Sequence, residues 1–119
     1  MSDFEIVKAN KETGGRKVDV LSLKGQLDAH TFPSLQKELE GLAGGDEPRV
    51  VLDCQDLEYI SSAGLGVLKK MTREFRGRDG DIRLAALPPK INNVVDLLGF
   101  NQVIKVFPGL TDAVDSYKD

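Results

Sequence analysis

The residues best suited to chemistry in this sequence stand in one short segment, YISSAGLGVLKKM, at positions 59–71. Two hydroxyls, a small residue and two alternating glycines occur there in the set Ser61, Ser62, Ala63, Gly64 and Gly66. Apolar residues recur after them at helical spacing, so the segment is predicted to begin a helix. A glycine in a helix costs up to about 1 kcal/mol relative to alanine, and the two glycines therefore need a reason.

Binding of a nucleotide phosphate is one function that glycines before a helix can serve. The dinucleotide fingerprint G-x-G-x-x-G needs three glycines, and here Gly64 and Gly66 fit while Lys69 takes the third place. A P-loop requires a glycine, four residues and then Gly-Lys-Ser/Thr, and no such run occurs. The sequence therefore argues against a nucleotide cofactor.

Nucleophilic catalysis by Ser62 is a second interpretation. The nucleophile elbow G-x-S-x-G is matched only in its second half, because Ile60 occupies the place of the first glycine. His30 is the only imidazole base, and a triad of Ser62, His30 and Asp28 stays open because triads assemble in space rather than in sequence. This enzymatic alternative predicts ester hydrolysis that depends on both Ser62 and His30.

Capping of the helix is the simplest role for one of the two serines. A serine just before a helix accepts a hydrogen bond from a first-turn N–H, and either Ser61 or Ser62 can do so. Capping does not account for Gly64 and Gly66. We expect these glycines to keep the helix start bare, as an anion or a docking protein would require.

Composition predicts a single globular domain over residues 1–119. The chain is 40% hydrophobic and 29% charged, which is ordinary for a soluble protein of this length. Its net charge is −3 and lysines and arginines form no run, so direct binding to nucleic acid is not expected.

Cysteine and histidine are too scarce for a disulfide framework or a zinc site. Cys54 is the single cysteine and is expected to be a small core residue. His30 is the only histidine, so a Cys/His zinc site is excluded. The sequence shows neither a signal peptide nor an apolar run of membrane-spanning length, and we expect a cytoplasmic protein without membrane insertion.

Hydrophobic periodicity predicts strands that alternate with helices. Strands are expected at 4–9, 18–25, 49–53, 81–87 and 102–107. Helices are expected from the Thr31 cap to Gly44, from the serine pair to Gly77, from Pro88 to Gly99, and over 110–118. In the third helix the predicted apolar stripe is Ile91, Val94, Val95 and Leu98.

The order β-β-α-β-α-β-α-β-α predicts an α/β fold with a mixed, mostly parallel sheet and four helices. The first two strands are expected to form a hairpin around Gly14 and Gly15, with a loop longer than two residues.

Three separated segments resemble the STAS domain of bacterial anti-sigma factor antagonists. They are GQLDAHTFPSLQKELE (25–40), DLEYISSAGLGVLKKM (56–71) and LPPKINNVVDLLGFNQVIKVF (87–107). The resemblance covers nearly the whole chain in order, and it implies a single-domain STAS-like fold that agrees with the predicted elements.

The resemblance also implies site residues. Aligning the family's Asp-Ser-Ser/Ala-Gly-Leu-Gly pattern places the phosphorylated serine at Ser62, while Ser61 stands where many members have aspartate and is the less favoured acceptor. Asp28 matches an aspartate that the family uses to engage its kinase. The implied partner-binding set is Asp28, Ser61, Ser62, Ala63, Gly64, Leu65 and Gly66.

What the resemblance implies about function is a binding module rather than an enzyme. The unphosphorylated protein would sequester an anti-sigma factor that is also a serine kinase, and a serine phosphatase would reverse the phosphorylation. The phosphate would repel a partner together with Asp28, Asp53 and Asp56, if these lie nearby. The alternative is a constitutive STAS scaffold, in a stress-sensing complex or beside a membrane transporter, without a phosphorylation cycle.

Overall fold

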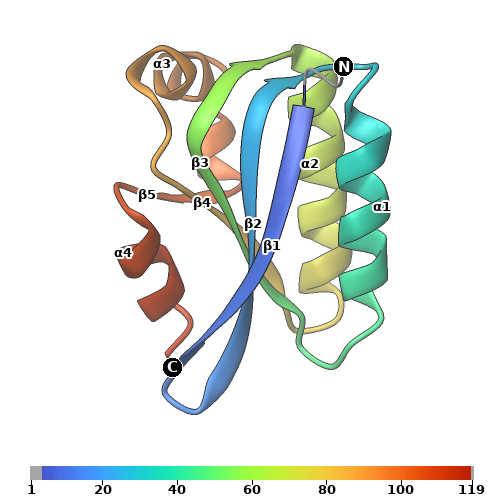
Figure 1. Cartoon of the computed structure of the whole chain (residues 1–119), viewed down its shortest axis with the longest axis vertical. Helices are drawn as coiled ribbons and strands as arrows, with labels where there is room; N and C mark the ends of the chain where they lie inside the picture. The colour runs from blue at the N-terminus through green and yellow to red at the C-terminus, as the bar shows by residue number, and fades with distance from the viewer. Residues whose placement is uncertain (1–3, 119) are drawn as a thin grey trace.

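A computed structural model describes residues 4–118, and its elements follow the predicted order. They are β1 (Phe4–Thr13), β2 (Arg16–Leu27), α1 (Phe32–Ala43), β3 (Arg49–Ile60), α2 (Ser62–Arg76), β4 (Asp81–Ala85), α3 (Pro89–Leu97), the 3-10 helix η1 (Phe100–Gln102), β5 (Lys105–Phe107) and α4 (Leu110–Asp115). The strands form one sheet in the order β1-β2-β3-β4-β5, with only the β1–β2 pair antiparallel (Figure 1). The predicted α/β class with a mixed, mostly parallel sheet is confirmed.

The β1–β2 hairpin turns on two residues, so the prediction of a longer loop is wrong. Thr13 pairs with Arg16, which leaves Gly14 and Gly15 as the whole loop. Both glycines have positive φ, 55° and 77°. A two-residue turn of this kind matches the twist of the strands but needs positive φ at both positions, and glycine adopts it without steric cost.

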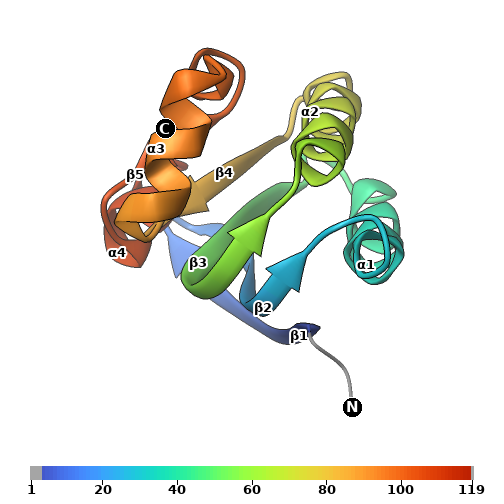
Figure 2. The same cartoon turned by 90° about the horizontal axis from the view of Figure 1, so that it is seen from above.

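The sheet is covered on both faces. Helices α1 and α2 pack side by side on one face, and α4 lies against the other (Figure 2). The predicted stripe of α2 is buried in the larger core: Leu65, Leu68, Met71 and Phe75. Cys54 is also buried there, as expected. Among residues 4–118, no helix has the length and apolar character to cross a bilayer.

Strand β3 is longer than the predicted 49–53. It continues to Ile60 because β2 pairs with it as far as the Leu27–Ile60 pair, whereas β4 pairs with it only up to Asp53. In this second half Cys54, Leu57 and Ile60 are buried, whereas the positions between them are exposed and can carry polar side chains without ending the strand. Their presence is what obscured the strand in the sequence.

The C-terminal elements are shorter than predicted. The amide groups of Val103 and Ile104 donate to the carbonyl oxygen of Phe100. These amides are therefore not available for pairing with β4, and β5 begins only at Lys105. In α3, Ile91 and Val95 are buried as predicted. The other two members of its predicted stripe, Val94 and Leu98, are exposed.

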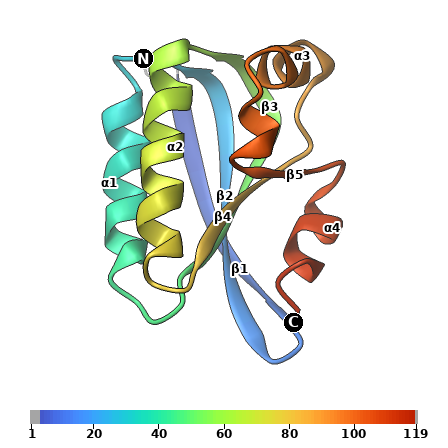
Figure 3. The same ribbon diagram turned by 180° about the vertical axis from the view of Figure 1, so that it is seen from behind.

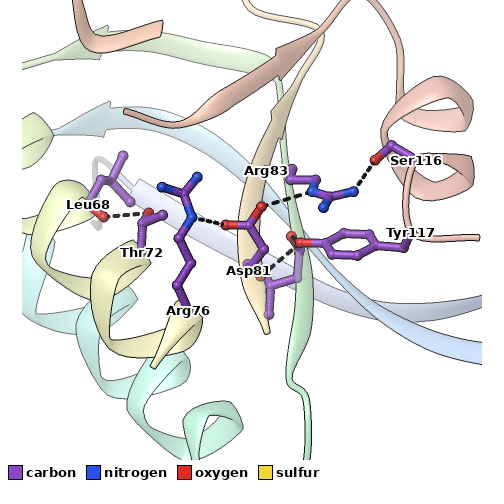
Figure 4. Close-up of polar contacts among 8 residues, drawn as sticks. Leu68, Thr72, Arg76, Asp81, Arg83, Ser116 and Tyr117 are labelled. Carbon is purple, nitrogen blue, oxygen red and sulfur yellow. Dashed lines mark hydrogen bonds and ion pairs between the residues drawn. The ribbon is translucent and has the colours of Figure 1, made fainter. Parts of the chain in front are cut away.

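A buried polar cluster ties together α2, β4 and the C-terminal segment at the end of the sheet where β4 begins (Figure 4). The Asp81 carboxylate accepts hydrogen bonds from Arg76 at 2.9 Å and from Arg83 at 3.0 Å. Arg83 also donates to Ser116 and lies 3.9 Å from the centroid of the Tyr117 ring. Because Asp81 is buried, the two guanidinium groups offset the cost of taking its charge out of water.

Candidate functional site

The ends of β2 and β3 bring the two segments of the candidate site together. These strands are parallel and adjacent, so their carboxyl ends meet at one edge of the sheet and lead into α1 and α2 (Figure 2). The backbone N–H of Ser61 donates to the carbonyl oxygen of Leu27 at 2.9 Å. Asp28 is the next residue after Leu27, and the predicted site residues on the two loops therefore lie beside one another.

Ser61 is the residue that caps α2. Its backbone is extended, and its hydroxyl oxygen accepts a hydrogen bond from the N–H of Gly64 at 3.0 Å. Its carbonyl oxygen accepts the N–H of Leu65 at 3.0 Å. The sequence left capping open between the two serines, and the structure assigns it to Ser61.

Ser62 is the first residue of α2, and its side chain is exposed. Within residues 4–118 its hydroxyl has no hydrogen-bond partner. The first turn of α2 contains no acidic residue, and the N-terminus of a helix carries a partial positive charge. An accessible hydroxyl in this position can accept a group such as phosphate without disturbing the cap.

The two glycines of the segment serve different purposes. Gly64 is buried, and a Cβ on it would lie 3.2 Å from the carbonyl oxygen of Leu27 and 3.5 Å from Ile60. Gly66 is exposed, and a Cβ on it would meet nothing within 4 Å. The expectation that both glycines keep the helix start bare therefore fits Gly66, whereas Gly64 permits α2 to approach β2 closely.

The remaining predicted members of the segment divide in the same way. Ala63 is exposed beside Ser62, whereas Leu65 is 3% exposed and belongs to the core. Leu65 can hold the helix in place but does not offer its side chain to a partner. The outer face of the helix start therefore consists of small side chains.

Asp28 organises the loop that leads into α1. Its carboxylate accepts the backbone N–H groups of His30 at 2.9 Å and Thr31 at 3.1 Å. The Thr31 N–H has the largest effect and holds the pKa of this carboxyl below its usual value; burial opposes it, and the His30 N–H lowers the pKa further. The predicted cap, Thr31, uses its hydroxyl differently: it donates to the Gln26 carbonyl oxygen at 2.7 Å.

A catalytic triad is not assembled at this site. The carboxylate of Asp28 binds the backbone of His30 rather than its ring, and the Ser61 hydroxyl is committed to the helix cap. No hydrogen bond joins His30 to Ser62 among the described residues. Among residues 4–118, therefore, no base is hydrogen-bonded to the Ser62 hydroxyl in the way that an activated nucleophile requires.

Asp53 and Asp56, which were expected to add to the repulsion of a partner by the phosphate if they lay nearby, do not line the start of α2. Asp56 precedes Ser61 by five residues in extended β3, and Asp53 precedes it by eight. At the usual rise of a strand these separations are roughly 16 Å and 26 Å along its axis. Asp28 is the acidic residue of the three that the fold brings to the site.

Sequence reasoning missed an apolar surface next to the site. Tyr59 is 51% exposed and lines a cavity of about 90 Å³ with Glu58 and Ile60 from β3 and with Lys90, Ile91 and Val94 from α3. An aromatic residue among the polar residues of β3 is the one signal in the sequence that pointed to it. Helical periodicity assigned Val94 to the core instead.

Comparison with known families and proteins agrees with this architecture. A family model described as the STAS domain matches residues 10–113. BtrV of Bordetella bronchiseptica, whose name describes it as an anti-sigma factor antagonist, is 31% identical over 99 residues, which span 83% of this chain and 85% of BtrV.

Solved structures show the same fold at lower identity. An anti-sigma factor antagonist from Mycobacterium paratuberculosis superposes with a TM-score of 0.79 at 24% identity, covering 97% of this chain and 96% of that one. The anti-sigma factor antagonist SpoIIAA in its unphosphorylated form gives a TM-score of 0.73 at 19% identity, with coverages of 94% and 96%. SpoIIAA of Bacillus in its phosphorylated form gives 0.66 at 18% identity, with coverages of 93% and 99%.

Proposed function

Because the chain belongs to the STAS domain family, we propose that it is an anti-sigma factor antagonist whose partner binding is switched by phosphorylation of Ser62. The observation that carries this proposal is that Ser61 and Ser62 have different structural roles. The Ser61 hydroxyl is occupied by the Gly64 N–H, whereas the Ser62 hydroxyl is exposed at the N-terminus of a 15-residue helix. One serine holds the helix, and the other is free to be modified.

In the unphosphorylated state the helix start is a docking surface. Ser62, Ala63 and Gly66 present small, neutral groups that let a partner backbone approach closely. Asp28 adds a carboxylate that is already fixed by two backbone N–H groups, so little conformational entropy is lost when it pairs with a partner cation. The surface therefore suits a protein partner with a basic group opposite Asp28.

In the phosphorylated state the domain keeps its fold but the surface changes. A phosphate adds about −1.5 to −2 charges, which the N-terminus of α2 tolerates. A partner packed on Ser62 meets the added bulk, the cost of desolvating the phosphate and a more negative surface around Asp28. A loss of about 2–3 kcal/mol weakens binding roughly 30- to 150-fold.

The partner is an anti-sigma factor that is itself a serine kinase and that phosphorylates Ser62 with its own ATP. A serine phosphatase restores the binding form, and the whole cycle takes place in the cytoplasm. While the antagonist holds the kinase, the sigma factor is released for transcription. The existence of SpoIIAA structures in both unphosphorylated and phosphorylated forms supports such a cycle for this fold. The protein is a binding module in this scheme, not an enzyme.

Affinity capture with three baits tests the switch. Wild type, Ser62→Ala and Ser62→Asp are used to capture proteins from the native cell extract, and the captured kinase is then purified and incubated with each bait and ATP. We expect the kinase on wild type and Ser62→Ala, its loss from Ser62→Asp, and phosphate on wild type alone. Ser61→Ala serves as the matched control and is expected to be phosphorylated.

Equal binding of the kinase to wild type and Ser62→Asp would reject the switch. Capture of transporter or stress-complex subunits by all three baits alike would instead establish the constitutive scaffold. The antagonist reading is favoured over that alternative by the names of the relatives that match most of the chain.

A further inference from the structure

The carboxylate of Asp28 is held through only one of its two oxygens. Oδ1 accepts the backbone N–H groups of His30 at 2.9 Å and of Thr31 at 3.1 Å. Within residues 4–118, Oδ2 has neither a hydrogen bond nor an ion pair. A carboxylate oxygen accepts about two hydrogen bonds, so Oδ1 is saturated while Oδ2 keeps its full capacity. Asp28 is half-exposed, and Oδ2 is therefore the atom that it can offer to another molecule.

Thr31 bonds to both the backbone and the side chain of Asp28. Its hydroxyl oxygen accepts the Asp28 N–H at 3.0 Å, and the hydroxyl donates its proton to the Gln26 carbonyl oxygen at 2.7 Å. The Thr31 N–H is one of the two donors to Oδ1. Loss of the hydroxyl would remove the partner of two backbone groups at the turn that aims these donors. The Thr31 hydroxyl thus maintains the orientation of the Asp28 carboxylate.

The loop around Asp28 is anchored on both sides. The Leu27 carbonyl oxygen accepts the Ser61 N–H, and the Asp28 carbonyl oxygen accepts the Phe32 N–H at 2.8 Å. Phe32 is 4% exposed and belongs to the larger core. Figure 3 shows that α1, which follows this loop, begins at the same end of the molecule as α2. The loop backbone is therefore fixed relative to the helix that carries Ser62.

A fixed carboxylate favours association with a partner cation. A side chain that is already ordered in the free protein loses little conformational entropy on binding, whereas a mobile one must be ordered at that moment. For one side chain this difference corresponds to roughly a threefold to tenfold change in the dissociation constant. Thr31 can therefore influence binding without touching the partner.

We propose that Thr31 is a positioning residue of the docking surface: it keeps Oδ1 of Asp28 turned into the loop and leaves Oδ2 to accept a cationic group of the anti-sigma factor. This inference rests on the proposed function. Thr31 acts through Asp28, so its contribution depends on the presence of the Asp28 carboxylate and is independent of the charge at Ser62.

A double-mutant cycle tests this proposal. The anti-sigma factor captured by the wild-type bait is purified, and calorimetry measures its dissociation constant for wild type, Thr31→Val, Asp28→Ala and the double variant. We expect Thr31→Val to weaken binding roughly threefold to tenfold in the wild-type background and by less than about twofold in the Asp28→Ala background. Thr31→Ser keeps the hydroxyl and is expected to bind like wild type.

A second threonine provides the matched control. Thr13 donates its hydroxyl to Asp115 at 3.0 Å and lies at the β1–β2 hairpin, whereas Asp28 follows the other end of β2. Thr13→Val therefore also removes a threonine–aspartate hydrogen bond, but far from the docking surface. We expect it to leave the dissociation constant within about twofold of wild type. Circular dichroism checks that every variant is folded.

The side-chain conformation of Asp28 is measured without any partner. Three-bond couplings between the Hα and Hβ protons of Asp28 report its χ1 angle by NMR. We expect the couplings of a single rotamer in wild type and Thr31→Ser, and intermediate, averaged couplings in Thr31→Val. The same single rotamer in all three proteins would overturn the positioning role.

The outcomes separate this inference from the proposed function. If Thr31→Val binds like wild type while Ser62→Asp releases the partner, the positioning role is rejected and the switch stands. If Thr31→Val weakens binding equally with and without the Asp28 carboxylate, Thr31 acts on its own and the proposal is overturned. If wild type binds no anti-sigma factor, the proposed function fails and, with it, the partner role of Oδ2, whatever the couplings show about Thr31.

Discussion

The backbone N–H of Ser61 donates a 2.9 Å hydrogen bond to the carbonyl oxygen of Leu27, and this bond joins the start of α2 to the end of β2. The same carbonyl oxygen is the atom that a Cβ on Gly64 would approach to 3.2 Å. One backbone group therefore sets the position of the helix that presents Ser62. It also places Asp28, the next residue, beside that helix.

Exchange of the two glycines for alanine should have opposite effects on stability. Gly66→Ala meets open space, so the higher helix propensity of alanine should raise the free energy of unfolding by up to about 1 kcal/mol. Gly64→Ala crowds a backbone carbonyl that is already hydrogen-bonded, and we expect it to lower the free energy of unfolding. Urea denaturation of the two variants measures the difference. A stabilised Gly64→Ala would show that α2 shifts freely.

Removal of the Ser61 hydroxyl should reduce stability, whereas removal of the Ser62 hydroxyl should leave stability nearly unchanged. Ser61→Ala loses the cap on the Gly64 N–H and should destabilise the protein by about 1 kcal/mol. Ser62→Ala removes an exposed hydroxyl without a partner in the described chain and should change stability by less than about 0.5 kcal/mol. Thermal unfolding followed by circular dichroism distinguishes them. Equal destabilisation by both would contradict the assignment of the cap.

Asp28 should contribute a pH-dependent share of stability. Its pKa lies below the ordinary value of 3.8, chiefly because the Thr31 N–H stabilises the carboxylate. A group whose pKa is lower in the folded state stabilises that state above the unfolded-state pKa, and the contribution is lost as pH falls through the folded-state pKa. The stability gap between wild type and Asp28→Asn should therefore be largest near neutral pH and should close below pH 3.8. Urea unfolding at a series of pH values measures this gap, and a gap that is independent of pH would refute the account.

Loss of the buried Asp81 carboxylate should be costly. Asp81→Asn removes the negative charge with which Arg76 and Arg83 each form an ion pair. We expect the free energy of unfolding to fall by roughly 3 kcal/mol. This is at the low end for a buried pair, because the Arg76 side chain is 41% exposed. The matched control is Asp79→Asn, an exposed aspartate two residues away, which should change stability by less than about 0.5 kcal/mol. If Asp81→Asn lowered the free energy of unfolding no more than Asp79→Asn does, the ion pairs of Asp81 would contribute little to stability.

Cys54 should be inert in the native protein. Burial raises the pKa of its thiol to about 12, so almost no thiolate is present at pH 8. A disulfide reagent such as dithionitrobenzoate should react only as fast as the protein opens, and addition of urea should accelerate the reaction. Immediate labelling of the folded protein at pH 8 would contradict the burial of this residue.

Local pattern in the sequence was sufficient for the order of the elements and for the segment that carries the site. The stripe Leu65, Leu68, Met71 and Phe75 predicts α2 because helical spacing repeats regardless of what the helix packs on. The glycine pair at 14 and 15 predicts the hairpin because only local backbone geometry is involved. The resemblance to the STAS family added Ser62 as the expected phosphorylated residue.

Non-local contacts decided what the pattern left open. Which serine caps α2, and why Gly64 is a glycine, depend on the carbonyl oxygen of Leu27, which is more than thirty positions earlier in the chain. The exposed side of α3 depends on how far its apolar stripe is covered by the sheet, so periodicity placed Val94 and Leu98 in the core while the structure leaves them at the surface. Periodicity shows that a residue is apolar on one helical face. Only the packed structure determines whether another element covers that face.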